Sequence, residues 1–150
     1  IKADGFNIGL AAIAFNGSMV FGRLIGDKLK QIFEIYNFLV FSVVGSFAGS
    51  LVIAFSSSLS FALIGFIMAG FCVSSIIPIC YTYGSSIKGV SPTVGISIIT
   101  IGTYGVFMIA PPTLGYVADM IGIEFVYTPM FILFFIVSII VILQKRLFKN

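Results

Sequence analysis

Long apolar runs separated by short polar stretches make up most of the chain. The first run covers residues 6–26, and a second covers residues 35–87 without a single charged side chain. An α-helix rises 1.5 Å per residue, so about 20 apolar residues cross a hydrocarbon core of roughly 30 Å. The second run would be ~80 Å long as one helix. It is therefore expected to fold back on itself, and the pattern predicts several transmembrane helices.

Serine and proline residues indicate where the individual helices begin. The serines at 56–58 supply the natural turn within the second run. Ser91 suits an N-cap, and Pro92 suits the first position of the helix that follows. The strands of a membrane barrel would alternate apolar and polar residues, which these runs do not do. The predicted fold class is therefore all-α, a polytopic transmembrane helix bundle. The expected spans are 6–26, 35–55, 59–83, 92–118 and 125–143.

Composition agrees with a membrane protein. Hydrophobic residues make up 59% of the chain and charged residues 9%, against about 45–50% and about 25% in soluble proteins. A soluble domain of 150 residues cannot hide that much apolar surface. The chain starts at Ile1 without a signal peptide pattern. It is interpreted as a piece of a longer protein in which residues 1–150 form a single membrane domain.

The basic residues predict an orientation rather than a nucleic-acid partner. With five crossings, alternate connections share one side of the membrane, and seven of the eight lysine and arginine residues fall on the same side. By the positive-inside rule that side is cytoplasmic, so the N-terminus lies outside and the C-terminus lies inside. The expected location is the inner membrane of a bacterium. The seven residues are Arg23, Lys28, Lys30, Lys88, Lys145, Arg146 and Lys149.

The residue types that support catalysis are scarce. The chain has no histidine, no carboxylate in the middle of a span and no Gly-x-Ser-x-Gly sequence. Cys72 and Cys80 lie in one apolar run, where buried small side chains are the usual outcome. We therefore expect no catalytic residue, no metal and no cofactor. A membrane-embedded enzyme is the disfavoured alternative, whereas a passive channel or an assembly subunit remains open.

Polar side chains at membrane depth indicate which spans face a cavity. The first, third and fourth spans carry them, whereas the fifth has only Ser138 in its middle and is expected to face lipid. Asn16, Tyr81 and Tyr104 are the candidates for solute contacts, because an amide and two phenols suit a ligand of mixed polarity. The alternative is that they bridge helices. The second span has a small-residue face suited to close packing, made of Ser42, Gly45, Ser46, Gly49 and Ser50.

Three prolines within the spans are candidate hinges. A proline removes one backbone hydrogen bond and presses its ring against the carbonyl four residues back. Pro78 therefore affects Ser74 in the third span. Pro111 and Pro112 affect residues 107 and 108, on the outer side of the fourth span. The alternative is that these kinks are static, since prolines are common in membrane helices.

A charged cluster at the cytoplasmic end of the first span is the most informative motif. Residues 22–29 read GRLIGDKL. A negative charge at a helix C-terminus is locally unfavourable, so Asp27 is expected to meet Arg23 or a positive group on a neighbouring helix. Gly22 and Gly26 are four residues apart and would let that neighbour approach closely. The alternative is a short charged loop that only orients the protein.

This cluster resembles the loop motif of the major facilitator superfamily, with Gly22, Arg23, Gly26, Asp27 and Lys28 at matching positions. The motif joins the second and third helices of each half. The run GTYGVFMIAPPTLGYVADMIG resembles the penultimate helix of permeases near the fucose permease and sugar efflux branches. The family often continues the motif with further basic residues and a glycine, whereas this chain has KQIFE at 30–34.

The resemblance implies a twelve-helix secondary transporter of which this chain supplies five spans. They would be helices eight to twelve, or alternatively two to six, since the two halves are related repeats. The implied activity is movement of a small solute, sugar-like or drug-like, by alternating access. The implied partners are that solute, the lipid bilayer and the N-terminal helices of the same protein. The cluster at 22–28 would act as a cytoplasmic gate.

Overall fold

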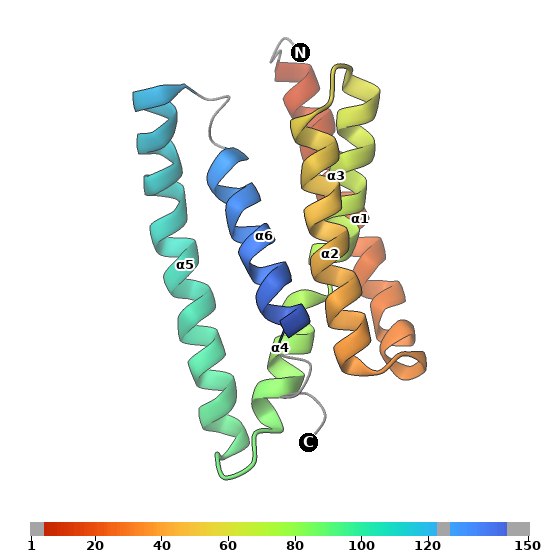
Figure 1. The fold of residues 1–150 in the computed structure, drawn as a ribbon, viewed down its shortest axis with the longest axis vertical. Coiled ribbons are helices and arrows are strands. Elements are labelled where there is room, and N and C mark those ends of the chain that lie inside the picture. The colour runs from red at the N-terminus through yellow and green to blue at the C-terminus, as the bar shows by residue number, and fades with distance from the viewer. Residues whose placement is uncertain (1–4, 123–126, 144–150) are drawn as a thin grey trace. The chain divides into compact units, whose positions relative to one another are not determined.

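The described structure is helical almost throughout. The computed structural model describes the backbone of residues 5–122 and 127–143, and the side chains of these residues except 5, 27, 30, 31 and 127–130. No strand occurs within the described ranges, which confirms the all-α prediction. The helices are α1 (Gly5–Ile32), α2 (Ile35–Ala54), α3 (Leu59–Val73), α4 (Ile76–Ser85), α5 (Pro92–Ile121) and α6 (Tyr127–Leu143) (Figure 1).

The helix starts follow the capping residues in the sequence. The Ser58 side chain accepts a hydrogen bond from the Phe61 amide, and Ser91 accepts one from Val94. Pro92 occupies the first turn of α5, where a backbone N–H has no acceptor within the helix, so its absence costs no hydrogen bond. Gly89, in the turn between α4 and α5, has a φ of 83°, which favours glycine. Local chemistry therefore accounts for the starts of α3 and α5.

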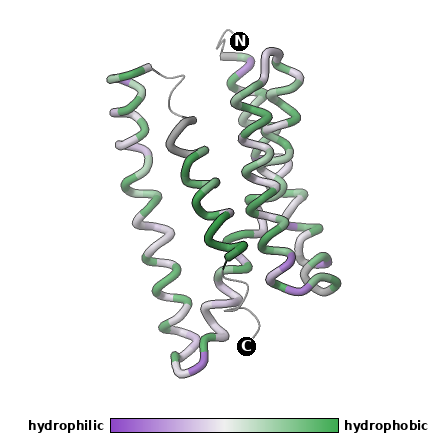
Figure 2. The backbone as a smooth tube through the Cα atoms, in the orientation of Figure 1, coloured by the Kyte–Doolittle hydropathy of each residue, from purple (hydrophilic) through white to green (hydrophobic). Residues whose placement is uncertain are grey.

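Among the described residues, four stretches are long and apolar enough to cross a membrane: Phe6–Gly26, Ile35–Ala54, Leu59–Ser85 and Pro92–Ile121. In α6, the apolar stretch whose side chains are described is shorter and covers Phe131–Leu143. Hydrophilic residues gather near helix ends, for example at the C-terminal end of α1 and in the turn after α4 (Figure 2). These features fit a polytopic helical membrane bundle. That all five spans form a single domain over residues 1–150 stays a prediction.

Three of the helices extend beyond the predicted spans; α4 ends at Ser85, two residues past the predicted end of the third span. α1 continues past Gly26 to Ile32, so the whole charged motif is helical rather than a loop. Its last residues include lysine, leucine and glutamine, which are good helix formers. α5 continues to Ile121, three residues beyond the predicted end, and Gly122 follows it with a φ of 102°. Residues 125 and 126, where the fifth span was expected to begin, lie outside the described residues.

The chain divides into two units, Ile1–Ile76 with Phe131–Asn150 and Ile77–Met130. In the first unit α3 packs on both α1 and α2, which barely touch each other. Gly45 lies against Cys72 and Gly65 against Ile53, so α2 and α3 are antiparallel. At Gly49, a Cβ atom would stand 2.7 Å from the Ala69 amide nitrogen. Small residues thus let the two backbones approach, as predicted for this face of the second span.

The described part of α6 packs on α2 within the first unit. The Phe47 ring lies 5.0 Å from the Phe131 ring and 5.6 Å from the Phe135 ring, in tilted arrangements. The Tyr36 hydroxyl donates a hydrogen bond of 3.1 Å to the Val141 carbonyl near the end of α6. Much of the remaining surface of this helix is exposed, including Ile132 and Leu133. α6 therefore has one packed side and a broad apolar exposed side.

The second unit contains the α4–α5 hairpin. Its helices meet at two glycines, because a Cβ atom on Gly95 would overlap the Gly84 carbonyl oxygen. The same Cβ atom would stand 2.8 Å from the Gly84 carbonyl carbon. Further along the hairpin, the Thr100 hydroxyl donates a hydrogen bond of 3.3 Å to the Tyr81 hydroxyl. One close backbone contact and one polar bridge therefore join α4 to α5.

Candidate functional site

The charged motif occupies the C-terminal part of α1. Gly22 and Gly26 are buried, whereas Arg23 and Lys28 are exposed. The terminal nitrogen Nη2 of Arg23 lies 3.9 Å from the Met19 sulfur. The side chain of Asp27 lies outside the described residues, so its predicted pairing with Arg23 stays a prediction. The helix thus presents its two glycines to a neighbour and two cations outward.

The neighbour of the two glycines is the end of α3. A Cβ atom on Gly22 would overlap the Ser74 hydroxyl and stand 2.7 Å from the Phe71 carbonyl oxygen. A Cβ atom on Gly26 would stand 2.7 Å from the Ser75 hydroxyl. Ser74 and Ser75 are only 3% and 4% exposed. The sequence predicted a close neighbour at these glycines but did not identify it.

Those two serines form an interruption in the third span. α3 ends at Val73 and α4 begins at Ile76, which places Pro78 in the first turn of a new helix. Amides in a first turn have no partner within the helix, so proline is tolerated there. The interruption includes Ser74, the residue that Pro78 was expected to affect. Motion at this point stays a prediction.

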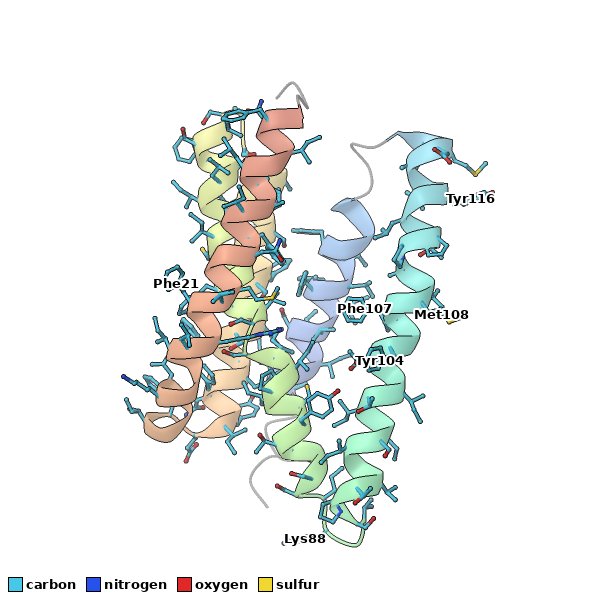
Figure 3. All side chains as sticks on the ribbon, turned by 180° about the vertical axis from the view of Figure 1, so that it is seen from behind. Phe21, Lys88, Tyr104, Phe107, Met108 and Tyr116 are labelled. Carbon is cyan, nitrogen blue, oxygen red and sulfur yellow. The ribbon has the colours of Figure 1, made fainter. Side chains whose placement is uncertain are left out.

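The three candidate solute contacts lie in different parts of the structure. Asn16 belongs to the first unit and is exposed, and its amide nitrogen donates to the Ala12 carbonyl of its own helix at 2.8 Å. Tyr81 and Tyr104 belong to the second unit. Tyr81 is half-buried and bonded to Thr100, whereas Tyr104 is 68% exposed. Tyr104, Phe107, Met108 and Tyr116 all project from α5 (Figure 3). The structure therefore pairs Tyr81 with Thr100, a residue not among the candidates.

An apolar hollow of about 710 Å³ lies along α5 in the second unit. Thr103 is the polar side chain in its lining, and its hydroxyl donates to the Ile99 carbonyl of the same helix at 2.8 Å. None of the three polar candidates lines it. The polar side chains from which the solute contacts are predicted do not indicate this apolar surface. The lining residues are Ile77, Ile99, Gly102, Thr103, Val106, Phe107, Ala110, Pro111 and Leu114.

Pro111 and Pro112 lie inside α5, which continues across them without interruption. The Thr113 hydroxyl donates to the Ile109 and Ala110 carbonyls, at 3.0 Å and 2.9 Å. The carbonyls of Phe107 and Met108 face two residues that have no N–H to donate. This part of the helix is therefore weaker in backbone hydrogen bonds although it remains helical.

Replacing Pro111 and Pro112 together with alanine is expected to leave membrane insertion intact. If the helix bends here during transport, the restored hydrogen bonds should slow turnover of the full-length protein by about tenfold, equivalent to ~1.4 kcal/mol. The control is Pro92→Ala, at a position where proline deletes no helical hydrogen bond. Turnover equal to that of the control would give the proline pair a structural role only.

Comparison with known proteins supports a membrane transporter. Over 114 residues, 76% of this chain, the sequence is 29% identical to the membrane protein MosC of Rhizobium meliloti, of which it covers 28%. Over 113 residues, 75% of this chain, it is 27% identical to an uncharacterized MFS-type transporter of Yersinia pestis, of which it covers 29%. The chain thus spans less than a third of the length of these relatives. No family model and no solved structure matches it.

These similarities and the apolar helices agree with each other. The chain is an integral membrane protein, and its likeness to an MFS-type transporter supports the resemblance to the major facilitator superfamily that the motif at residues 22–28 suggested. The similarity does not favour one branch of that superfamily or one half of the fold.

Proposed function

We propose that this chain is part of a secondary active transporter that moves a small solute across the membrane by alternating access. The observation that carries the proposal is the motif GRLIGDKL in a chain that is similar to an MFS-type transporter over 75% of its length. In this proposal the five helices are the eighth to twelfth of a twelve-helix fold. The nearest branches are those of the fucose permease and the sugar efflux proteins. An enzyme is disfavoured, because the chain lacks histidine and mid-span carboxylates.

The solute is proposed to meet α4 and α5. Tyr81 supplies a phenol held by Thr100, and the exposed Tyr104 adds a second phenol on α5. Phenols combine a hydroxyl with a flat apolar face, which suits sugar-like or drug-like molecules. Asn16 on α1 is the third proposed contact. Its amide would have to exchange its bond with Ala12 for one with the solute.

Transport against a gradient is the direct test. Proteoliposomes that contain the full-length protein should accumulate one member of a panel of radiolabelled hexoses, pentoses and lipophilic cations when an ion gradient is imposed. Tyr81→Phe keeps the ring and removes the hydroxyl, so it should raise the KM for that solute about tenfold if the hydroxyl binds it. Equilibration without accumulation would instead indicate a passive channel.

We also propose that the N-terminus of the chain lies outside the cell and that the C-terminus is cytoplasmic, in a bacterial inner membrane. Ser57 lies between α2 and α3, and Gly89 lies between α4 and α5; both are exposed. In intact cells, a cysteine at position 57 should react with a membrane-impermeant maleimide, and one at position 89 should not. The reverse pattern would overturn the orientation.

A further inference from the structure

The glycine pair of the motif and the interruption of the third span form one contact. Contacts between α1 and α3 follow the same order along both helices. Gly70 lies against Phe15 and Ser18, and Gly22, one turn after Ser18 on α1, lies against Ser74. The helices are therefore parallel, and α3 ends where the motif begins. In the same order, Gly26 lies against Ser75, the last residue before α4.

Three features hold the end of α3 in a defined position at this contact. The Ser74 hydroxyl donates to the Phe71 carbonyl at 2.6 Å, and the Ser74 amide donates to the Gly70 carbonyl at 3.2 Å. These bonds close the last turn of α3, where carbonyls otherwise lose their partners. Both serines are buried. The end of α3 is therefore a defined surface onto which two glycines of α1 fit.

We infer that Gly22 and Gly26 act as a glycine seat, which positions the interruption at Ser74–Ser75 and transmits movement between the charged motif and the third span. The inference rests on the proposed transport function for its role, but the contact itself does not. A continuous α3–α4 helix is disfavoured by Pro78, so the interruption has to be held by something other than helical hydrogen bonds. The glycine seat supplies that support, and the four glycine and serine residues are positioning residues.

The two glycines should respond differently to alanine. The added methyl at Gly22 meets the Phe71 backbone, which cannot move aside, whereas at Gly26 its tight contact is with the Ser75 hydroxyl alone. The next neighbours of a Cβ atom at Gly26 are the Ser75 Cβ at 3.9 Å and the Phe38 ring at 4.0 Å, which are ordinary contacts. Ser75→Ala should therefore rescue Gly26→Ala, whereas Ser74→Ala should not rescue Gly22→Ala.

The native thiol of Cys80 reports on the far side of the interruption. In the full-length protein in membranes, alkylation of Cys80 by N-ethylmaleimide would be followed by mass spectrometry of its peptide. Gly22→Ala should change the rate at least ~threefold, as expected for a shift of a few-fold in a conformational equilibrium. Gly17→Ala is the matched control on the same helix, since a Cβ atom there has nothing within 4 Å.

A second control separates an effect on the position of the interruption from a general loss of stability. Gly49→Ala overfills the α2–α3 contact at Ala69, on the side of α3 that faces α2 and not α1, so it should lower thermal stability and leave the Cys80 rate unchanged. Equal Cys80 rates in Gly22→Ala, Gly49→Ala and Gly17→Ala would overturn the inference. If Gly22→Ala does not fold, Gly26→Ala with and without Ser75→Ala gives the same comparison. A changed Cys80 rate in a protein that accumulates no solute would support the glycine seat and count against the transport proposal.

Discussion

Gly95→Ala is expected to destabilise the full-length protein by ~2–4 kcal/mol, the largest effect of any single methyl group considered for the α4–α5 hairpin. The added methyl would overlap the Gly84 carbonyl oxygen, and a backbone carbonyl cannot rotate away as a side chain can. The two helices would have to separate. That separation also weakens the Thr100–Tyr81 hydrogen bond, which contributes roughly 0.6 kcal/mol if it is typical of membrane proteins.

Two other glycines in the hairpin serve as controls for Gly95→Ala. A Cβ atom on Gly84 would meet mainly the Cδ1 atom of Ile99, the movable end of a side chain, so Gly84→Ala should cost much less. A Cβ atom on Gly102 has nothing within 4 Å, and Gly102→Ala should be neutral or slightly stabilising. Unfolding midpoints in sodium dodecyl sulfate would rank the three variants. If Gly95→Ala unfolds at the same midpoint as Gly102→Ala, the close α4–α5 contact is wrong.

The starts of α3 and α5 could be predicted because they depend on local chemistry. Ser58 and Ser91 act as N-caps within one turn. The start of α4 at Ile76 was not predicted, because the apolar pattern indicates one span over 59–83 with a candidate hinge at Pro78. The end of α1 could not be predicted in this way. Hydropathy indicates where the apolar span stops, at Gly26, but the backbone stays helical for as long as the residues favour it.

The partners of the candidate residues depend on packing, which a single sequence does not specify. The spacing of Gly22 and Gly26 predicted a close neighbour, yet only the fold identifies it as the end of α3. Tyr81 is a candidate because of its phenol, and Thr100, which bonds to this phenol, is on another helix, 19 positions away. The Asn16 amide donates to the Ala12 carbonyl of its own helix, and its contact with a solute stays a prediction. Predicting side-chain partners requires knowing which helix faces lie together.

Asp27→Asn is expected to reduce transport by the full-length protein about five- to thirtyfold, which corresponds to ~1–2 kcal/mol. Asp27 directly follows Gly26, the last residue of the apolar span, in the turn before the last turn of α1. Because the helix ends five residues later, at Ile32, the helix dipole acts on this charge less than the sequence suggested. The expected effect therefore rests mainly on the predicted positive partner of this carboxylate on a neighbouring helix.

The proposed role of that pair is to keep the cytoplasmic side closed. Its loss should favour the inward-open state, so Asp27→Asn should insert normally while engineered cysteines in the cytoplasmic cavity react faster with a maleimide. Lys30→Gln is the matched control, because it also removes one charge from the same end of α1 but lies outside the motif. Because the glycine seat does not depend on this charge, Asp27→Asn should leave the steric rescue of Gly26→Ala by Ser75→Ala unchanged. If Asp27→Asn and Lys30→Gln give the same labelling and the same transport rate, Asp27 only orients the protein, and the gate must be sought elsewhere.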